Sequence, residues 1–285
     1  MKTDVPPIIA VKELFDLRHS NKLVIVNATS GPNALSNYQE KHLDGALFLD
    51  LNGHLSEIHE DAANGGRHPL PTIENFAKTI SEIGITQNSH VVIYDDKGGA
   101  NASARFWWML KAIGHEKVQV LNGGIQEAEK QQFPINSEKV SRTRVALYPV
   151  TSWKLPVVEI DEVEQVSQDV DHIVVDVRAA PRYNGEFEPL DLIAGHIPGT
   201  VNVPFAENLD SDGLFKSPNE LKEKYTKLFG DIPKENIVFH CGSGVTACHS
   251  LLAITHSGLE IPKLYVGSWS EWSRNDKAIA IETKE

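Results

Sequence analysis

Short apolar runs recur along the chain, and each is followed by polar or glycine-containing residues and then by a helix-like segment. The same series occurs twice in the same order, which indicates an internal duplication. Strands that alternate with helices predict parallel sheets covered by helices on both faces. The paired runs are residues 23–29, 42–49, 91–95 and 118–124 in the first half and residues 173–178, 196–203, 237–241 and 264–268 in the second.

The length of 285 residues suits two domains rather than one core. Residues 133–156 are rich in polar, proline and β-branched residues without a helical period, as is typical of an extended connection. We therefore predict an α/β protein with a first domain over residues 1–140, a linker over 141–155 and a second domain over 156–285.

The charge and the apolar runs exclude several classes of partner. A formal net charge of -12 argues against nucleic acid, because phosphate binding needs an excess of Lys and Arg. No run approaches the length of a membrane span, and residues 1–7 lack the apolar stretch of a signal peptide, so we expect a cytoplasmic protein with no membrane partner. The twelve histidines lack the spacing of a metal site, and we expect neither metal nor cofactor.

Cys241 is the candidate nucleophile. It follows an apolar strand and precedes a helix, in the run CGSGVT over residues 241–246. Gly242 and Gly244 allow the backbone N–H groups of the loop, with those of Val245 and Thr246, to turn toward one point and cradle an anion. A helix amino terminus favours the thiolate, and it would also favour a persulfide anion formed on it. The carboxyl end of a parallel strand is, in addition, where α/β proteins place their sites.

Other interpretations of these cysteines are less favoured. A free cysteine is commonly a small buried packing residue, and this is the preferred interpretation of Cys248. A cysteine phosphatase would need an arginine at the sixth position after the cysteine, where this chain has Ala247. A cysteine hydrolase would need a histidine facing the thiolate, whereas His240 is adjacent in the strand and is predicted to point to the opposite face.

The run CGSGVTA resembles the active-site loop of the 3-mercaptopyruvate sulfurtransferases, which are members of the tandem rhodanese family. The similarity extends to the runs GHIPGT, GSWSEW, RHPLP and ARFWW and so covers nearly the whole chain. It implies two rhodanese-like domains, of which the second is catalytic through a Cys241 persulfide. The first would be inactive, since Asp95 stands where it would carry a cysteine.

The resemblance also assigns roles outside the loop. Ser243 and His68 match two members of a Ser-His-Asp arrangement that handles protons, and the acid position falls on Asn52. Asp50, Glu60 and Asp61 are alternatives for that acid. Arg182 matches the first of two arginines that hold the donor carboxylate, and a guanidinium fork suits a carboxylate. Leu190 stands at the second, so the pocket would bind a carboxylate more weakly or use a cation from elsewhere in the fold.

Two donors and one non-catalytic function remain as alternatives. Thiosulfate-specific rhodaneses carry Arg and Lys where this chain has Gly242 and Ser243, so the neutral loop favours 3-mercaptopyruvate over thiosulfate. The resemblance implies cyanide or a dithiol protein such as thioredoxin as the acceptor, and a monomer. A rhodanese-like interaction protein without activity is the third possibility. Trp269 and Trp272 are interpreted as core packing rather than substrate contacts.

Overall fold

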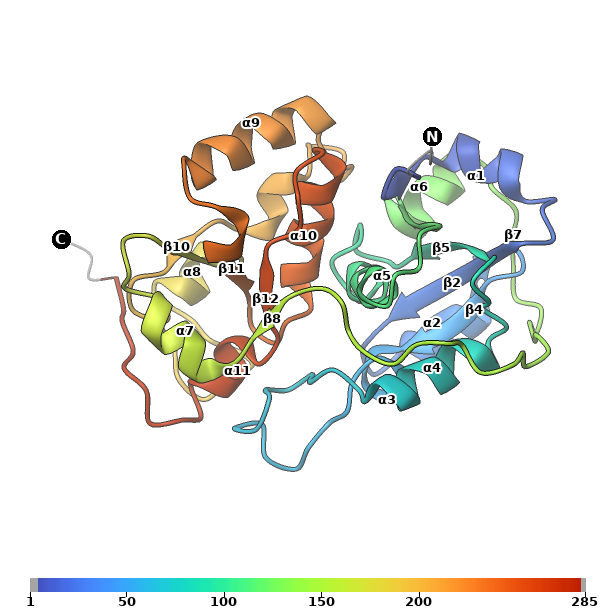
Figure 1. Cartoon of the computed structure of the whole chain (residues 1–285). Coiled ribbons are helices and arrows are strands. Elements are labelled where there is room, and N and C mark those ends of the chain that lie inside the picture. The colour runs from blue at the N-terminus through green and yellow to red at the C-terminus, as the bar shows by residue number, and fades with distance from the viewer. Residues whose placement is uncertain (1–4, 283–285) are drawn as a thin grey trace. The chain divides into compact units, whose positions relative to one another are not determined.

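The computed structural model describes residues 5–282, and contacts divide the chain into two compact units (Figure 1). Unit 1 contains residues 1–57, 71–154 and 213–215 as far as they are described, and unit 2 contains residues 58–70, 155–212 and 216–285 with the same restriction. Residues 58–70 thus belong with the second unit, although they come from the first half of the sequence.

Unit 1 has a five-stranded parallel sheet in the order β1-β6-β5-β2-β4, with helices packed on its faces (Figure 1). A short antiparallel pair, β3 with β7, lies beside it. The elements are β1 Ile8–Ile9, α1 Val11–Leu17, β2 Leu23–Thr29, α2 Ala34–Glu40, β3 His42–Leu43, β4 Leu47–Asp50, α3 Leu51–His54, α4 Ile73–Glu82, β5 His90–Tyr94, α5 Ser103–Ala112, β6 Val118–Leu121, α6 Gly124–Lys130 and β7 Ile135–Asn136.

Unit 2 repeats this arrangement in the order β8-β12-β11-β9-β10, again with every pair parallel. The isolated antiparallel bridge between His196 and Ala280 corresponds to the β3–β7 pair. The elements are β8 Val157–Val158, α7 Ile160–Val166, β9 Ile173–Asp176, α8 Ala180–Tyr183, β10 Val201–Asn202, η1 Phe205–Asn208, α9 Pro218–Phe229, η2 Lys234–Asn236, β11 Ile237–His240, α10 Thr246–His256, β12 Lys263–Tyr265 and α11 Ser268–Trp272.

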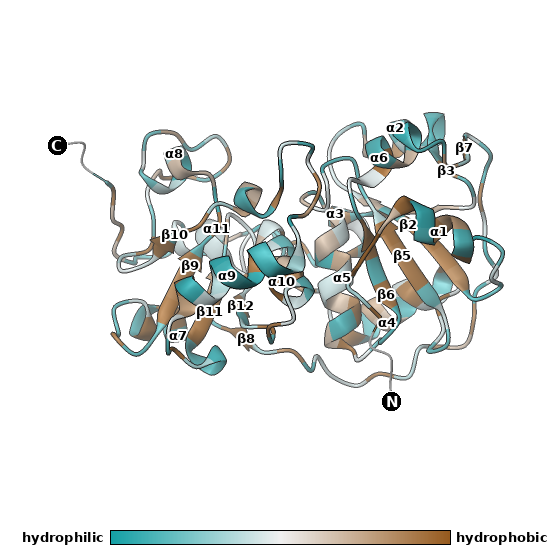
Figure 2. Cartoon of the chain, turned by 90° about the horizontal axis from the view of Figure 1, so that it is seen from above, coloured by the Kyte–Doolittle hydropathy of each residue, from teal (hydrophilic) through white to brown (hydrophobic). Residues whose placement is uncertain are grey.

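The matching order confirms the predicted α/β fold and the internal repeat. The central strands are buried along their length, because helices cover both sheet faces, and they form the hydrophobic bands of Figure 2. The edge strands β1 and β8 were not expected, because strands of two residues are too short to give a periodic signal. Residues 196–203 form a bridge, a turn and the two-residue strand β10.

The segment between the two sheets packs on unit 1. Tyr148 is buried, its backbone N–H donates to Ser81 Oγ at 2.9 Å, and its hydroxyl lies 2.9 Å from His115 Nδ1. Trp153 packs its ring against Phe76. These contacts hold an extended segment in place without a helix or strand.

Candidate active site in unit 2

Cys241 lies at the carboxyl end of β11, which is the central strand of its sheet. The loop turns directly into α10, which begins at Thr246, so Val245 is the residue before the helix. Gly244 has a φ of +70°, and a Cβ there would come within 2.5 Å of the Val266 carbonyl oxygen. Glycine is therefore required for this turn. Cys241 itself is 1% exposed, which places its thiol in a largely water-free environment.

The segment after β12 fixes the backbone of this loop. The Ser268 hydroxyl accepts a hydrogen bond from the Cys241 N–H at 3.2 Å. The N–H groups of Trp269 and Ser270 donate to the carbonyls of Cys241 and Gly242 at 3.0 and 2.8 Å. These bonds fix the backbone of the cysteine loop, which supports a preorganised anion cradle. Trp269 and Trp272 lie in the hydrophobic core of the unit, as expected.

His68 lies next to Ser243. Its Nδ1 is 2.7 Å from the Ser243 hydroxyl oxygen, which is a hydrogen bond whose direction depends on the histidine tautomer. The loop that carries His68 is held against α11. The Gly65 N–H donates to Glu271 at 2.8 Å, and the Arg67 N–H donates to Ser270 Oγ at 3.0 Å. The structure thus brings together the serine and histidine that the resemblance pairs.

The candidates for the acid of the Ser-His-Asp arrangement lie in or beside α3 and in the loop before His68. Asn52 is exposed in the short helix α3 of unit 1. The Asp50 carboxylate caps that helix by accepting from the Gly53 N–H at 2.8 Å. Asp61 accepts from the Ala63 N–H at 2.9 Å in the loop before His68, and Glu60 is exposed. The role of the acid therefore stays a prediction.

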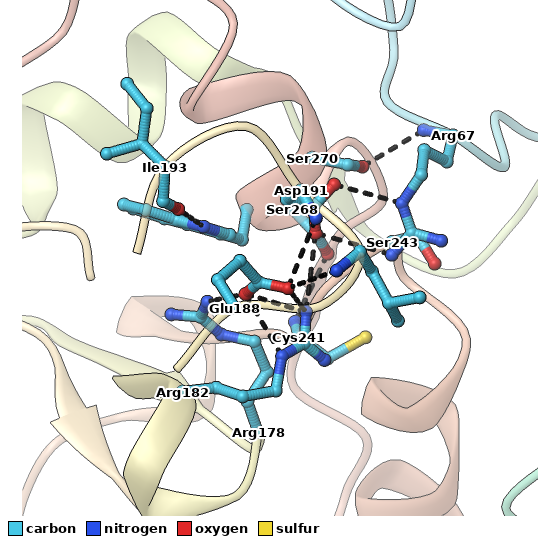
Figure 3. Close-up of polar contacts among 12 residues, drawn as sticks. Arg67, Arg178, Arg182, Glu188, Asp191, Ile193, Cys241, Ser243, Ser268 and Ser270 are labelled. Atoms are coloured by element: carbon cyan, nitrogen blue, oxygen red, sulfur yellow. Dashed lines mark hydrogen bonds and ion pairs between the residues drawn. The ribbon is translucent and has the colours of Figure 1, made fainter. Parts of the chain in front are cut away.

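Arg182 lies in α8 and is held by two buried carboxylates (Figure 3). Its Nε and Nη2 donate to Glu188 at 2.7 to 3.0 Å, and Nη2 also lies 3.4 Å from Asp191 Oδ2. The Glu188 and Asp191 side chains are 2% and 0% exposed, whereas the Arg182 side chain is 19% exposed. The Arg182 side chain is therefore closer to solvent than the two carboxylates that bind it. Leu190, at the position of the second expected arginine, is 57% exposed.

Two more arginines reach the same Asp191 carboxylate. Arg67 donates to it from Nε at 3.0 Å and from Nη2 at 3.4 Å, and Arg274 donates from Nη1 at 3.0 Å. In Figure 3, Asp191 and Glu188 lie between Arg67 on one side and Arg178 and Arg182 on the other. Sequence reasoning assigned no role to Arg67, Asp191 or Arg274. The position of Arg67 directly before His68 was the one available signal.

A buried ion pair lies beneath the site. The Arg178 guanidinium donates to Asp176 at 2.6 Å and stacks over the Trp269 ring at 4.7 Å. His240 is fully buried, with its Nδ1 3.3 Å from the Cys241 carbonyl oxygen. Burial lowers the pKa of His240 below its ordinary value, so it is neutral near pH 7. Its ring contacts the backbone of Cys241, which does not suit it to activate the thiol.

The corresponding loop of unit 1 contains Asp95 after β5. Its buried carboxylate accepts five hydrogen bonds at 2.7 to 3.2 Å, from the N–H groups of Lys97, Gly99, Asn101 and Ser103 and from the Ser103 hydroxyl. A cavity of about 470 Å³ lies beside this loop and is lined in part by Thr29, Asp96 and Lys97. None of the residues that line this cavity is a cysteine.

Within residues 5–282, no group of three or more His, Cys, Asp or Glu side chains could hold a metal ion, and no helix is long and apolar enough to cross a membrane. Part of the amino-terminal segment that suggested a cytoplasmic location lies outside the described residues.

Comparisons with known proteins agree with the repeated fold. The rhodanese-like domain model matches residues 8–131 and again residues 159–275. A probable 3-mercaptopyruvate sulfurtransferase of Pseudomonas aeruginosa is 39% identical over 236 residues, which cover 82% of each protein. A thiosulfate sulfurtransferase of Rattus norvegicus is 37% identical over 245 residues, covering 85% of this chain and 80% of that protein. The solved structure of a 3-mercaptopyruvate sulfurtransferase from Leishmania major superposes with a TM-score of 0.80 at 28% identity, covering 94% of this chain and 75% of that one. With both halves matched and the loop, sheet order and repeat in agreement, the chain belongs to the rhodanese family.

Proposed function

We propose that the protein is a sulfurtransferase that takes sulfur from 3-mercaptopyruvate and carries it as a persulfide on Cys241. The observation that carries the proposal is the placement of Cys241 in a glycine-containing loop between β11 and α10, next to a bonded Ser243–His68 pair and beside Arg182. Relatives named as sulfurtransferases of 3-mercaptopyruvate and of thiosulfate support the class of reaction.

The first half-reaction moves one sulfur atom. The Cys241 thiolate attacks the donor sulfur, an S–S bond forms, and the S–C bond of the donor breaks with its electron pair going to carbon. The resulting enolate takes up the proton that the donor thiol released and becomes pyruvate. Ser243, bonded to His68 at 2.7 Å, is placed to pass this proton, and the loop amides stabilise the persulfide anion that remains.

The second half-reaction regenerates the thiolate. A cyanide ion or a thiolate attacks the outer sulfur of the persulfide and leaves with it, and the electron pair of the S–S bond returns to Cys241 Sγ. With a dithiol protein such as thioredoxin, the second thiol then displaces sulfide and closes a disulfide. Because Cys241 is 1% exposed, a small acceptor or a protruding dithiol loop fits this step best. A monomer acting in the cytoplasm is part of the same proposal.

Thiosulfate is the second candidate donor, and one observation favours it. The three arginines around Asp191 supply more positive charge near the loop than the sequence alone indicated. That charge would attract a dianion as well as a carboxylate. The neutral residues Gly242 and Ser243 inside the loop still favour the donor whose charge lies farther from its sulfur.

Intact mass spectrometry after incubation with each donor tests the proposal. We expect a gain of one sulfur atom on the wild type and on Cys248→Ser, and no gain on Cys241→Ser. The values of kcat/KM for the two donors, measured with cyanide and with a dithiol protein, then rank them, and mercaptopyruvate is expected to be at least tenfold better. The absence of an adduct with both donors would disprove the carrier role. An adduct that persists in Cys241→Ser would assign it to another residue.

A further inference from the structure

We propose that Arg67 supplies the second guanidinium of the donor pocket and, with Arg182, binds the donor carboxylate over Gly242. This inference rests on the proposed function and names the residue that performs the task for which Leu190 is unsuited. Leu190 is apolar and 57% exposed, so a second cation must come from another part of the chain.

The position of Gly242 is the first observation. A Cβ placed on this glycine would lie 3.2 Å from Arg67 Nη2, 3.3 Å from Arg182 Nη2 and 3.4 Å from Arg182 Nη1. Two guanidinium groups from distant parts of the sequence therefore converge on one point, one residue beyond Cys241. Because Gly242 has no side chain, both guanidinium groups can lie close to the loop backbone at this point.

The charge around this point is the second observation. The cluster holds four guanidinium groups and three buried carboxylates, which leaves one net positive charge: Arg67, Arg178, Arg182 and Arg274 against Asp176, Glu188 and Asp191. In a chain of net charge -12, this charge is a local reversal beside the nucleophile. An anionic ligand balances it, and exclusion of water strengthens that attraction.

The remaining hydrogen-bonding capacity of Arg67 is the third observation. The bonds of its side chain recorded among residues 5–282 run from Nε and Nη2 to Asp191 alone. A guanidinium has five N–H donors, so the Nη1 edge is available to another acceptor. Its side chain is 25% exposed above an Asp191 side chain that is 0% exposed. The loop backbone is already fixed through Gly65 and Arg67 N–H, which leaves the side chain for a ligand.

The place of the cations also separates the donors. They lie beside Gly242 rather than directly over the cysteine sulfur. In 3-mercaptopyruvate the carboxylate is separated from the sulfur by two carbon atoms, whereas the charged oxygens of thiosulfate are on the atom bonded to the transferred sulfur. A clamp displaced along the loop therefore suits the carboxylate donor, and Arg67 becomes a residue that sets donor preference.

Arg67→Met tests this role, with Arg274→Met as the matched control. Both changes remove one positive charge and one partner of Asp191, but Arg274 is not among the nearest groups to the Gly242 position. We expect Arg67→Met to raise KM for mercaptopyruvate by about 10-fold to 100-fold, as for loss of a charge-assisted bond, with a smaller change in kcat. Arg67→Lys should recover part of the loss, because it restores the charge without the fork. Arg274→Met also removes positive charge around Asp191, so it should raise KM for mercaptopyruvate, but by a smaller factor of about threefold, because it removes no group next to Gly242.

A second readout needs no sulfur donor. Iodoacetate carries a carboxylate and iodoacetamide is its uncharged analogue, and both alkylate a thiolate. The ratio of their rates at Cys241, mapped by mass spectrometry, should fall about tenfold in Arg67→Met and only about threefold in Arg274→Met, which loses the charge but no group next to Gly242. A ratio that is unchanged in Arg67→Met, or that falls equally in both variants, would overturn the role of Arg67. If wild type accepts no sulfur from either donor but the ratio still falls, the carboxylate site stands and the proposed function fails.

Discussion

The loops that begin at Asp95 and Cys241 occupy the same place in the two units, but only the first has a carboxylate of its own for the loop amides to bind. Each follows the central strand of a five-stranded parallel sheet and leads into a buried helix. In unit 1 the amides of the loop converge on the carboxylate of Asp95 itself. In unit 2 the corresponding position is Cys241, the candidate nucleophile.

The length of each loop accounts for the difference. Asp95 is followed by seven residues before α5 begins at Ser103, and this longer loop can wrap around its own side chain. Cys241 is followed by only four residues before α10, so its loop is taut and is held from outside by the segment after β12. The amides of the unit 1 loop therefore bind a carboxylate of the loop itself, whereas we propose that the loop of unit 2 receives an external anion.

The charged and proton-handling groups around the two loops also differ. Arg67 and Arg182 lie over Gly242 in unit 2, with buried carboxylates holding them in place. Two residues after Cys241, unit 2 has Ser243 bonded to His68, whereas two residues after Asp95, unit 1 has an exposed Lys97. A duplicated fold thus kept its sheet and changed the charge and proton-handling groups of one loop.

The largest effect is expected from placing a cysteine in the loop of unit 1. We predict that Asp95→Cys combined with Cys241→Ser takes up no sulfur, because the longer loop lacks the arginines and the Ser–His pair. The same change should lower the free energy of unfolding of unit 1 by about 3 to 5 kcal/mol, since buried N–H donors lose their acceptor. Mass spectrometry with mercaptopyruvate and urea unfolding measure the two effects.

The control for this double variant is Asp96→Asn with Cys241→Ser. The Asp96 side chain is exposed, so its bond to Asn101 at 2.9 Å contributes little to stability. Its stability should change by less than about 1 kcal/mol. A persulfide on the introduced cysteine would show that the loop alone suffices and would remove the contrast between the units.

Much of this contrast could be predicted from sequence, because its elements are local. The strand before Cys241, the turn at Gly244 and the substitution by Asp95 are all encoded within a few residues. The two parallel sheets could be predicted because the apolar runs occur in the same order in both halves of the sequence. Edge strands of two residues gave no period to detect.

The part that could not be predicted depends on contacts between distant segments. Asp191 gathers Arg67 and Arg274, which are 124 and 83 residues away in sequence, and nothing in the local sequence of any one of them indicates the others. The sequence also did not predict that Arg182, the expected ligand of the donor carboxylate, bonds to Glu188. Ionic clusters of this kind require the folded geometry.

A smaller effect is expected from the Ser243–His68 pair, which has no counterpart in the Asp95 loop. We predict that Ser243→Ala and His68→Gln each lower kcat with mercaptopyruvate by about 100-fold, within the range of general acid–base catalysis. The double variant should be little worse than either single one, because the 2.7 Å bond makes the two residues act together. With thiosulfate the loss should be below about tenfold, since sulfite leaves as a stable anion. Additive losses in the double variant, from single-turnover kinetics, would show that the residues act separately.

The smallest effect concerns acid stability, in which the units should also differ. Burial lowers the pKa of His115 in unit 1 to about 4, and its two ring nitrogens lie 2.9 Å from the Tyr148 hydroxyl and 3.1 Å from the Ser89 carbonyl oxygen. Between the ordinary histidine value of about 6.5 and pH 4, the unfolded chain binds a proton that the folded unit does not, so stability falls as pH falls through that window. We expect a loss of about 2 kcal/mol between pH 7 and pH 5 from this one group.

In unit 2 the buried His240 lies 3.8 Å from the Asp176 carboxylate, whose charge partly offsets the effect of burial. Urea unfolding at pH 7 and pH 5 should therefore show that unit 1 unfolds at a lower urea concentration at pH 5. The substitution His115→Gln should remove most of this shift while lowering stability at pH 7. If the variant keeps the full pH dependence of the wild type, then carboxylates rather than His115 set the acid limit of unit 1. The two units would then differ in their loops but not in their response to acid, because the buried imidazole of unit 1 would contribute nothing that unit 2 lacks.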